Sequence, residues 1–191
     1  MDDPSEDYRR SLDECRKHHE SSKTYSGKLL RPHAPFIKAI IDRHDCRSVL
    51  DYGAGKGVQY RWVCDTPIGS IPVGMTIEEY WGISVTKYDP AYPPFAAEPQ
   101  GQFDLVICTH VLGSIPDGDL GWVIDRLHAL ARKAIYVAEK LGPVKKRFLP
   151  VKSRTADDWA ALLRRDSPVE VTLATRIRTP DRGVIVERRV L

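Results

Sequence analysis

The sequence predicts one α/β domain in which a mostly parallel sheet carries helices on both faces and ends in an antiparallel hairpin. Short apolar runs, typical of strands buried on both faces, alternate with segments of helical spacing. The last two runs alternate apolar and polar residues, and the short turn 179–183 that joins them requires an antiparallel pair. With 191 residues, 42% of them apolar, the chain is long enough for one domain with a real core.

Residues 1–35 differ in character from the rest of the chain. The first 24 residues are polar and charged, which suits a surface helix or a mobile arm. A glycine and two prolines within 25–35 suit a connector, and residues 36–41 then repeat apolar side chains at helical spacing. We therefore expect an N-terminal arm or lid over residues 1–35 and the main domain over 36–191.

Strands and helices alternate through the main domain. The apolar runs predict strands over 48–51, 83–89, 103–108, 134–138, 169–177 and 183–190. Helical spacing predicts helices over 59–63, 120–132 and 159–165. Thr76 to Glu79 has the pattern of a capping box, and Thr155 to Asp158 is a good helix start. Residues 90–101 hold four prolines, so we expect no long helix there.

The most informative stretch runs from Ser48 to Gly57. An apolar strand ends in Asp51, and three glycines follow at alternate positions, Gly53, Gly55 and Gly57. Glycine supplies positive φ and has no Cβ, so such a turn lets the backbone come close to a nucleotide-like ligand. The order DxGxGxG differs from the dinucleotide fingerprint GxGxxG, in which the acidic residue follows the glycines by about twenty positions. This difference argues against a nicotinamide cofactor.

The glycine stretch resembles the nucleoside-binding motif of class I (Rossmann-like) S-adenosylmethionine-dependent methyltransferases. The resemblance covers roughly residues 36–191 and includes two further segments. One is Asp89 after the second strand. The other is Phe103 to Pro116, which is similar to FDxVxxxxVLEHIP in many small-molecule methyltransferases. The resemblance implies the α/β sheet with its C-terminal hairpin, S-adenosyl-L-methionine as cofactor, and methyl transfer to a small-molecule acceptor.

The resemblance also implies which residues hold the cofactor. The backbone of Gly53, Gly55 and Gly57 would lie against its methionine part, and Asp51 would help to organise its ammonium end. Asp89 would accept hydrogen bonds from both ribose hydroxyls. Asp51 has an alternative role as a helix N-cap. Asp89 lies 38 positions after Asp51 and has an alternative role as the start of an Asp-Pro turn. In that case Glu78 or Glu79 would be the ribose ligand.

The third segment brings Thr109 and His110 to the carboxyl end of a strand, where ligands bind in open α/β sheets. Thr109 is therefore included among the cofactor-binding residues. His110 is the candidate general base because its ordinary pKa is near neutral; alternatively it only hydrogen-bonds a loop. Gly113 and Ser114 replace the Glu-His of the family pattern. The short stretch 90–102 gives no adenine contact to assign.

Two alternative functions stay open. Asp89 to Tyr92 also resembles the [DNS]PP[YFW] motif of enzymes that methylate exocyclic amines in nucleic acids. That motif normally ends the fourth strand, so a nucleic-acid acceptor is the less favoured reading. The chain could also bind the cofactor without catalysis, as a sensor or partner subunit. For the acceptor pocket we expect residues 1–35, 64–80 and 140–155, including Tyr25, His33, Trp81 and Arg147, each of which is otherwise a surface or packing residue.

Composition adds limits on partners and location. A net charge of +3 predicts no concentrated basic face for nucleic acid. The four cysteines share no CxxC spacing, so we expect no metal site and a reducing environment. No run of about eighteen apolar residues predicts a membrane span, and the acidic start does not resemble a secretory signal. The sequence therefore favours a cytoplasmic protein and says nothing of oligomeric state.

Overall fold

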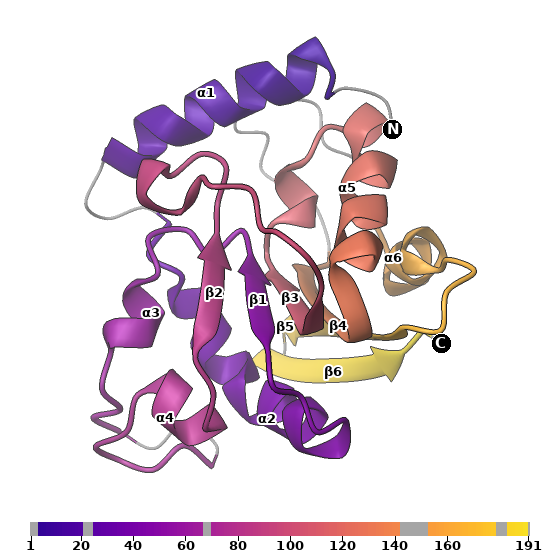
Figure 1. Ribbon diagram of the computed structural model, residues 1–191. Coiled ribbons are helices and arrows are strands. Elements are labelled where there is room, and N and C mark those ends of the chain that lie inside the picture. The colour runs from indigo at the N-terminus through magenta and orange to yellow at the C-terminus, as the bar shows by residue number, and fades with distance from the viewer. Residues whose placement is uncertain (1–3, 21–24, 67–69, 142–152, 179–182, 191) are drawn as a thin grey trace.

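The computed structural model describes residues 4–20, 25–66, 70–141, 153–178 and 183–190 (Figure 1). These residues form one sheet with the strand order β2-β1-β3-β4-β5-β6. The strands are β1 (Val49–Tyr52), β2 (Val85–Tyr88), β3 (Phe103–Thr109), β4 (Ala131–Lys140), β5 (Glu170–Arg178) and β6 (Gly183–Arg189). Strands β2, β1, β3, β4 and β5 are all parallel, which establishes an α/β fold. At the edge, β6 pairs with β5 in the antiparallel sense, and residues 179–182 of the expected turn lie outside the described ranges.

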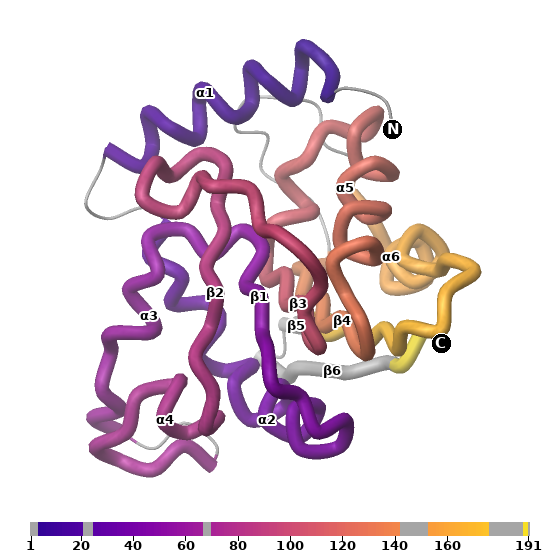
Figure 2. Tube along the Cα trace, viewed as in Figure 1, coloured from indigo at the N-terminus to yellow at the C-terminus, as the bar shows by residue number. Residues whose placement is uncertain are grey.

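Helices pack on both faces of the sheet. The α-helices are α1 (Glu6–Glu20), α2 (Ala34–Arg43), α3 (Val58–Arg61), α4 (Ile77–Trp81), α5 (Asp117–Leu130) and α6 (Ala156–Leu163). The described residues also form the short 3₁₀ turns η1 (Lys28–His33), η2 (Pro93–Phe95) and η3 (Leu112–Ser114). Helices α2, α3 and α4 share one apolar core, whereas α5 and α6 share the other. Figure 2 follows the chain through these two layers.

The two cores arise from the alternation of side chains along the strands. In β3, Val106 and Cys108 belong to the core under α5 and α6, and Leu105 and Ile107 belong to the core under α2. All four are fully buried, because a central parallel strand is covered on both sides. The near-continuous apolar run that predicted this strand is therefore confirmed.

The two helix starts that the sequence predicted at Thr76 and Thr155 are confirmed. Thr76 and Glu79 form a reciprocal capping box at the start of α4, and Thr155 and Asp158 form another at the start of α6. The helix expected over 59–63 is one turn that starts at Val58, and the one expected over 120–132 begins earlier, at Asp117. The proline-rich stretch carries only the short turn η2, since its prolines cannot donate helical hydrogen bonds.

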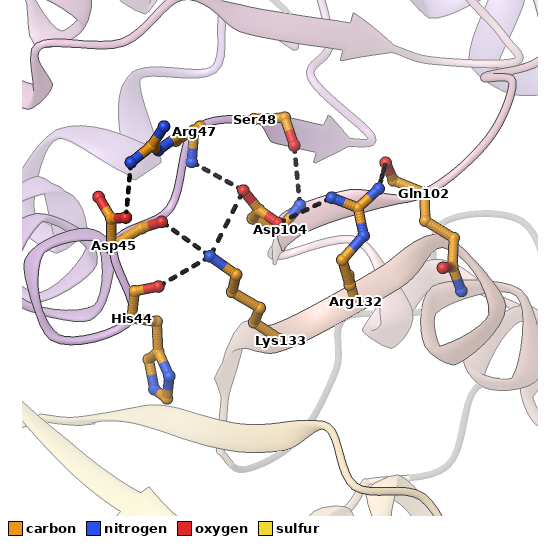
Figure 3. A network of polar contacts seen from close by, with 8 residues as sticks. All are labelled: His44, Asp45, Arg47, Ser48, Gln102, Asp104, Arg132 and Lys133. Carbon is orange, nitrogen blue, oxygen red and sulfur yellow. Dashed lines mark hydrogen bonds and ion pairs between the residues drawn. The ribbon is translucent and has the colours of Figure 1, made fainter.

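The amino end of the sheet is held by a network around Asp104 (Figure 3). Asp104 is buried and accepts hydrogen bonds from the Arg47 N–H at 2.8 Å and from the Arg132 guanidinium at 3.0 Å. Lys133 lies 3.7 Å from the same carboxylate. Burial raises the pKa of Asp104, but the Arg47 N–H and the two cations outweigh it and hold the pKa below its ordinary value. The negative charge of Asp104 at this end of the sheet is therefore balanced by hydrogen-bond donors and cations.

Helix α1 lies above the carboxyl ends of β1 and β2 (Figure 1). Its Tyr8 packs edge-on against Trp122 of α5, with ring centroids 5.5 Å apart. Of the described helices, neither α1 nor any other has the length and apolar character needed to cross a bilayer.

Candidate cofactor and active site

The glycine turn follows β1 and is fastened to the end of β2. The N–H groups of Gly53 and Ala54 both donate to the carbonyl of Tyr88, at 2.7 and 3.0 Å. Gly53, Gly55 and Gly57 have φ values of +85°, +59° and +61°, a region that side chains disfavour. Packing restricts the turn further: a Cβ at Gly53 would lie 2.3 Å from Val111, and a Cβ at Gly55 would lie 2.4 Å from the carbonyl oxygen of Tyr25. Both the turn conformation and its close neighbours therefore require glycine.

Asp51 lies at the end of β1, fully enclosed by protein. The Tyr60 hydroxyl donates to its Oδ2 at 2.8 Å, and the Gln59 side-chain amide donates to the same oxygen at 3.3 Å. Its Oδ1 is buried and has no hydrogen-bond partner. Burial, with a smaller contribution from the charge of Asp89, raises the pKa of Asp51 to about 7. The N-cap alternative is wrong, because Gly57 is the N-cap residue of the following helix and no side chain caps it.

Asp89 follows β2 and reaches across to the glycine turn. Its Oδ2 accepts the Gly55 N–H at 2.9 Å, so the second strand and the glycine turn meet as expected. Its Oδ1 accepts the Ala91 N–H, also at 2.9 Å, which is the Asp-Pro turn of the alternative reading. The two roles are compatible because a carboxylate has about four acceptor positions.

The glutamates considered in place of Asp89 have other roles. Glu79 closes the capping box of α4 by accepting the Thr76 N–H at 2.7 Å. Glu78 accepts the Val85 N–H at 2.7 Å and pairs with Lys87 at 3.1 Å. Glu79 therefore caps α4, and Glu78 holds α4 against β2. Asp89 is the acid that reaches the glycine turn.

Thr109 and His110 lie at the carboxyl end of β3. The His110 N–H donates to the Ala138 carbonyl of β4 at 2.7 Å, and the His110 backbone has φ +59°. Its ring lies edge-on to the ring of buried His33, with centroids 5.6 Å apart. The Tyr136 hydroxyl is 2.9 Å from Nδ1 of His33. His110 is thus part of a polar cluster that connects β3, β4 and η1.

His19 at the end of α1 and Tyr25 cover the glycine turn. The His19 ring is buried, stacks on Tyr92 with centroids 5.0 Å apart, and brings Nε2 to 3.6 Å from Oδ1 of Asp89. The Tyr25 ring is 4.8 Å from that of His19, and the Tyr25 carbonyl accepts the Lys56 N–H at 2.8 Å. His19 was not predicted, since nothing in the polar sequence of α1 distinguishes it.

A buried carboxylate, Glu139, was also missed. It lies near the end of β4 and is 4% exposed, and the backbone N–H groups of Val111, Leu112 and Gly113 act to lower its pKa. Burial outweighs these donors and raises its pKa to about 7. The sequence carried a signal for it, because Glu139 follows an apolar run just as Asp51 does.

The structure therefore brings most of the predicted residues to one edge of the sheet. Asp51, the three glycines and Asp89 are joined by hydrogen bonds or by the turn itself, and Val111 connects them to the Thr109–His110 segment. Of the expected acceptor residues, Tyr25 and His33 lie by this edge. Trp81 instead packs in the core and donates to the Ala34 carbonyl at 2.9 Å. Arg147 lies outside the described residues.

Comparison with known proteins agrees with this arrangement. The family model described as "Methyltransferase domain" matches residues 5–143, which is more than half of the chain and includes the glycine turn, Asp89 and the β3 segment. No curated protein matches the sequence significantly. With the parallel α/β sheet and the acids at the ends of β1 and β2, the match shows that the chain belongs to the class I (Rossmann-like) S-adenosylmethionine-dependent methyltransferase family.

Proposed function

We propose that this methyltransferase uses S-adenosyl-L-methionine and transfers its methyl group to a small-molecule acceptor. The observation that carries the proposal is the buried Oδ1 of Asp51, which has no protein partner beside a turn that requires three glycines. An unpaired buried carboxylate oxygen destabilises the protein unless a cation or donor meets it. The α-ammonium group of the cofactor is such a partner, so the residues present fit it.

Each proposed ligand residue has a distinct task. Asp51 would accept from the ammonium group, while the backbone of Gly53, Gly55 and Gly57 would lie against the methionine part. Asp89 would use its remaining acceptor positions for the two ribose hydroxyls, since its Gly55 and Ala91 bonds occupy only part of its capacity. Thr109 would complete the site from β3. When bound, the cofactor supplies a sulfonium-activated methyl group.

The residues of β3 and η1 would handle the acceptor. His110 would take a proton from an acceptor that has one to lose, and the Tyr136–His33 pair packs against its ring. Methyl transfer otherwise depends on holding the acceptor in line, which contributes most of the acceleration. His110→Ala should therefore lower turnover about 100-fold while binding of S-adenosylhomocysteine stays unchanged.

Residues 1–35 would act as the lid of this site. His19 lies against the proposed ribose acid, and the Tyr25 carbonyl lies against the proposed cofactor turn. A cofactor that takes these acceptor positions must move His19 or share Asp89 with it. His19→Ala should therefore speed association of S-adenosylmethionine in stopped-flow fluorescence; an unchanged association rate would exclude the lid role.

Calorimetric titration with S-adenosylmethionine, S-adenosylhomocysteine and NAD tests the cofactor directly. Saturable binding of the first two and none of NAD is expected. Asp89→Asn should weaken binding at least about tenfold, equivalent to about 1.4 kcal/mol, because one carboxylate accepts two hydroxyl bonds. Asp104→Asn is the matched control at the opposite end of the sheet and should leave affinity unchanged.

The acceptor class needs a separate measurement. Transfer of labelled methyl groups from the cofactor to a small-metabolite fraction, and none to DNA or RNA, is the expected result. Label in nucleic acid would favour the amine-methylating alternative suggested by Asp89 to Tyr92. Cofactor binding without transfer to any fraction would favour a sensor or partner subunit.

A further inference from the structure

Glu139 is the penultimate residue of β4, in the strand that pairs with the one leading to the proposed catalytic histidine. The β3–β4 ladder pairs Thr109 with Ala138, and the His110 N–H extends it by donating to the Ala138 carbonyl at 2.7 Å. Glu139 is the next residue of β4 and is 4% exposed. His110 and Glu139 therefore follow paired residues of adjacent strands.

The Glu139 carboxylate lies against the loop that follows His110. The backbone N–H groups of Val111, Leu112 and Gly113, the three residues after the histidine, favour its charged form. A Cβ at Gly113 would lie 3.0 Å from Oε2 of Glu139, so the carboxylate fills the space that a side chain at 113 would need. This packing gives a reason for glycine where the family pattern has glutamate.

The same loop contacts the proposed cofactor turn. Val111 packs where a Cβ of Gly53 would otherwise lie, at 2.3 Å from its Cγ2. His110, immediately before the loop, has a left-handed backbone that is disfavoured for a residue with a side chain. Such a conformation persists only when surrounding contacts impose it. The close approach of the Glu139 carboxylate to Gly113 is a contact of that kind.

We propose that Glu139 is the positioning residue of the active site, holding the 111–113 loop so that His110 and Val111 keep their orientation toward the cofactor turn. This role rests on the proposed function of His110. Glu139 acts through the loop and does not itself take the acceptor's proton.

The surroundings of Glu139 make this hold sensitive to pH. Burial brings the pKa of Glu139 to about 7, with Lys140 lowering it slightly. The Cys108 thiol of β3 faces both Glu139 and Asp51, and burial and these two charges raise its pKa. The second oxygen of Glu139, Oε1, is buried without a hydrogen-bond partner. Protonation removes the charge that attracts the three N–H groups, so the hold on the loop should weaken below neutral pH.

Nuclear magnetic resonance of the full chain tests the proposal without an acceptor. In the wild type, the amide resonances of residues 111–113 should titrate with a midpoint near pH 7, and Glu139→Gln should remove this transition. The imidazole resonance of His110 should change in Glu139→Gln, because the loop that follows His110 is no longer held. Glu139→Ala should add line broadening of His110.

Two further variants keep the test decisive. Gly113→Ala pushes against Oε2 without changing any charge and should perturb the His110 resonance in the same way; it also replaces Glu139→Ala if that variant does not fold. Glu170→Gln is the control. Glu170 is a buried carboxylate, 7% exposed, at the start of β5 and thus at the amino end of the sheet, and its replacement should leave the His110 resonance unchanged.

The outcomes separate this inference from the proposed function. Unchanged His110 resonances in both Glu139→Gln and Gly113→Ala would overturn the positioning role, even if the cofactor binds. Failure of the wild type to bind S-adenosylhomocysteine would overturn the proposed function instead, and the link from Glu139 to His110 would still be measured.

Discussion

Replacing Asp51 by asparagine should stabilise the cofactor-free protein while destroying cofactor binding. The Asp51 carboxylate is enclosed, and its Oδ1 has no partner. Asparagine has nearly the same shape but no charge. Its amide oxygen can still accept the hydrogen bond that the Tyr60 hydroxyl donates to Oδ2 of Asp51, at 2.8 Å, in the wild type. The variant therefore removes the cost of burying a charge and keeps the packing.

The magnitude follows from the pKa of Asp51, which burial raises from 3.8 to about 7. A raised pKa means that the native state binds the proton more tightly than the unfolded chain does. Stability is then greatest below pH 3.8 and falls as the pH rises to about 7. The full loss amounts to about 4 kcal/mol, of which about 3 kcal/mol arises between pH 5 and pH 8.

Urea denaturation of both proteins at pH 5 and pH 8 measures this directly. Asp51→Asn should gain up to about 4 kcal/mol over the wild type at pH 8 and clearly less at pH 5. Glu139 titrates in the same range, but it is present in both proteins and cancels in the difference. The reasoning is refuted if the difference in free energy of unfolding is the same at the two pH values.

Further predictions concern the rest of the fold. Asp104→Asn should destabilise the protein by about 2 kcal/mol at neutral pH, with a smaller loss in acid, because the lowered pKa of Asp104 contributes stability only above its titration range. Gly53→Ala should destabilise by at least about 1 kcal/mol from its positive φ alone, and its clash with Val111 should add to the loss. Thr155→Ala should cost about 1 kcal/mol through its cap. Thermal and urea unfolding check all three.

The sheet was predictable because its strands are short apolar runs bounded by turns. Strands β1, β3 and β4 begin and end within a few residues of the predicted positions. Strand β2 is shorter than the predicted 83–89. Its amino end is held by Glu78, which accepts the Val85 N–H, and this contact with α4 is not visible in the local sequence. Boundaries of this kind depend on tertiary contacts.

The site was predictable as far as it is local. Asp51 and the glycines are adjacent in sequence, and Asp89 follows a strand, so their meeting at one edge follows from parallel pairing. The cover formed by His19 and Tyr25 was not predictable, because it depends on how a polar helix docks over the sheet. The residues 142–152 of the expected acceptor region are outside the described ranges.

Buried carboxylates at the two ends of the sheet differ in whether cations pair with them. At the amino end, Asp104 is paired with Arg132 and Lys133, and Glu170 is paired with Arg43 and Arg189 at 2.9 and 3.2 Å. At the carboxyl end, Asp51 and Glu139 each keep one buried oxygen without a hydrogen-bond partner, and burial raises both pKa values to about 7.

Stability alone does not explain this asymmetry. At the amino end, arginine and lysine side chains pair with the buried carboxylates Asp104 and Glu170. An unpaired charge in the interior lowers stability, and titratable groups perturbed in this way cluster where ligands and reactions need them. The carboxyl end is also where the required glycines and the left-handed His110 lie. Burial of the unpaired Asp51 charge destabilises the cofactor-free protein, and a bound cationic ligand would relieve that cost. Asp51→Asn should therefore raise stability and abolish binding together.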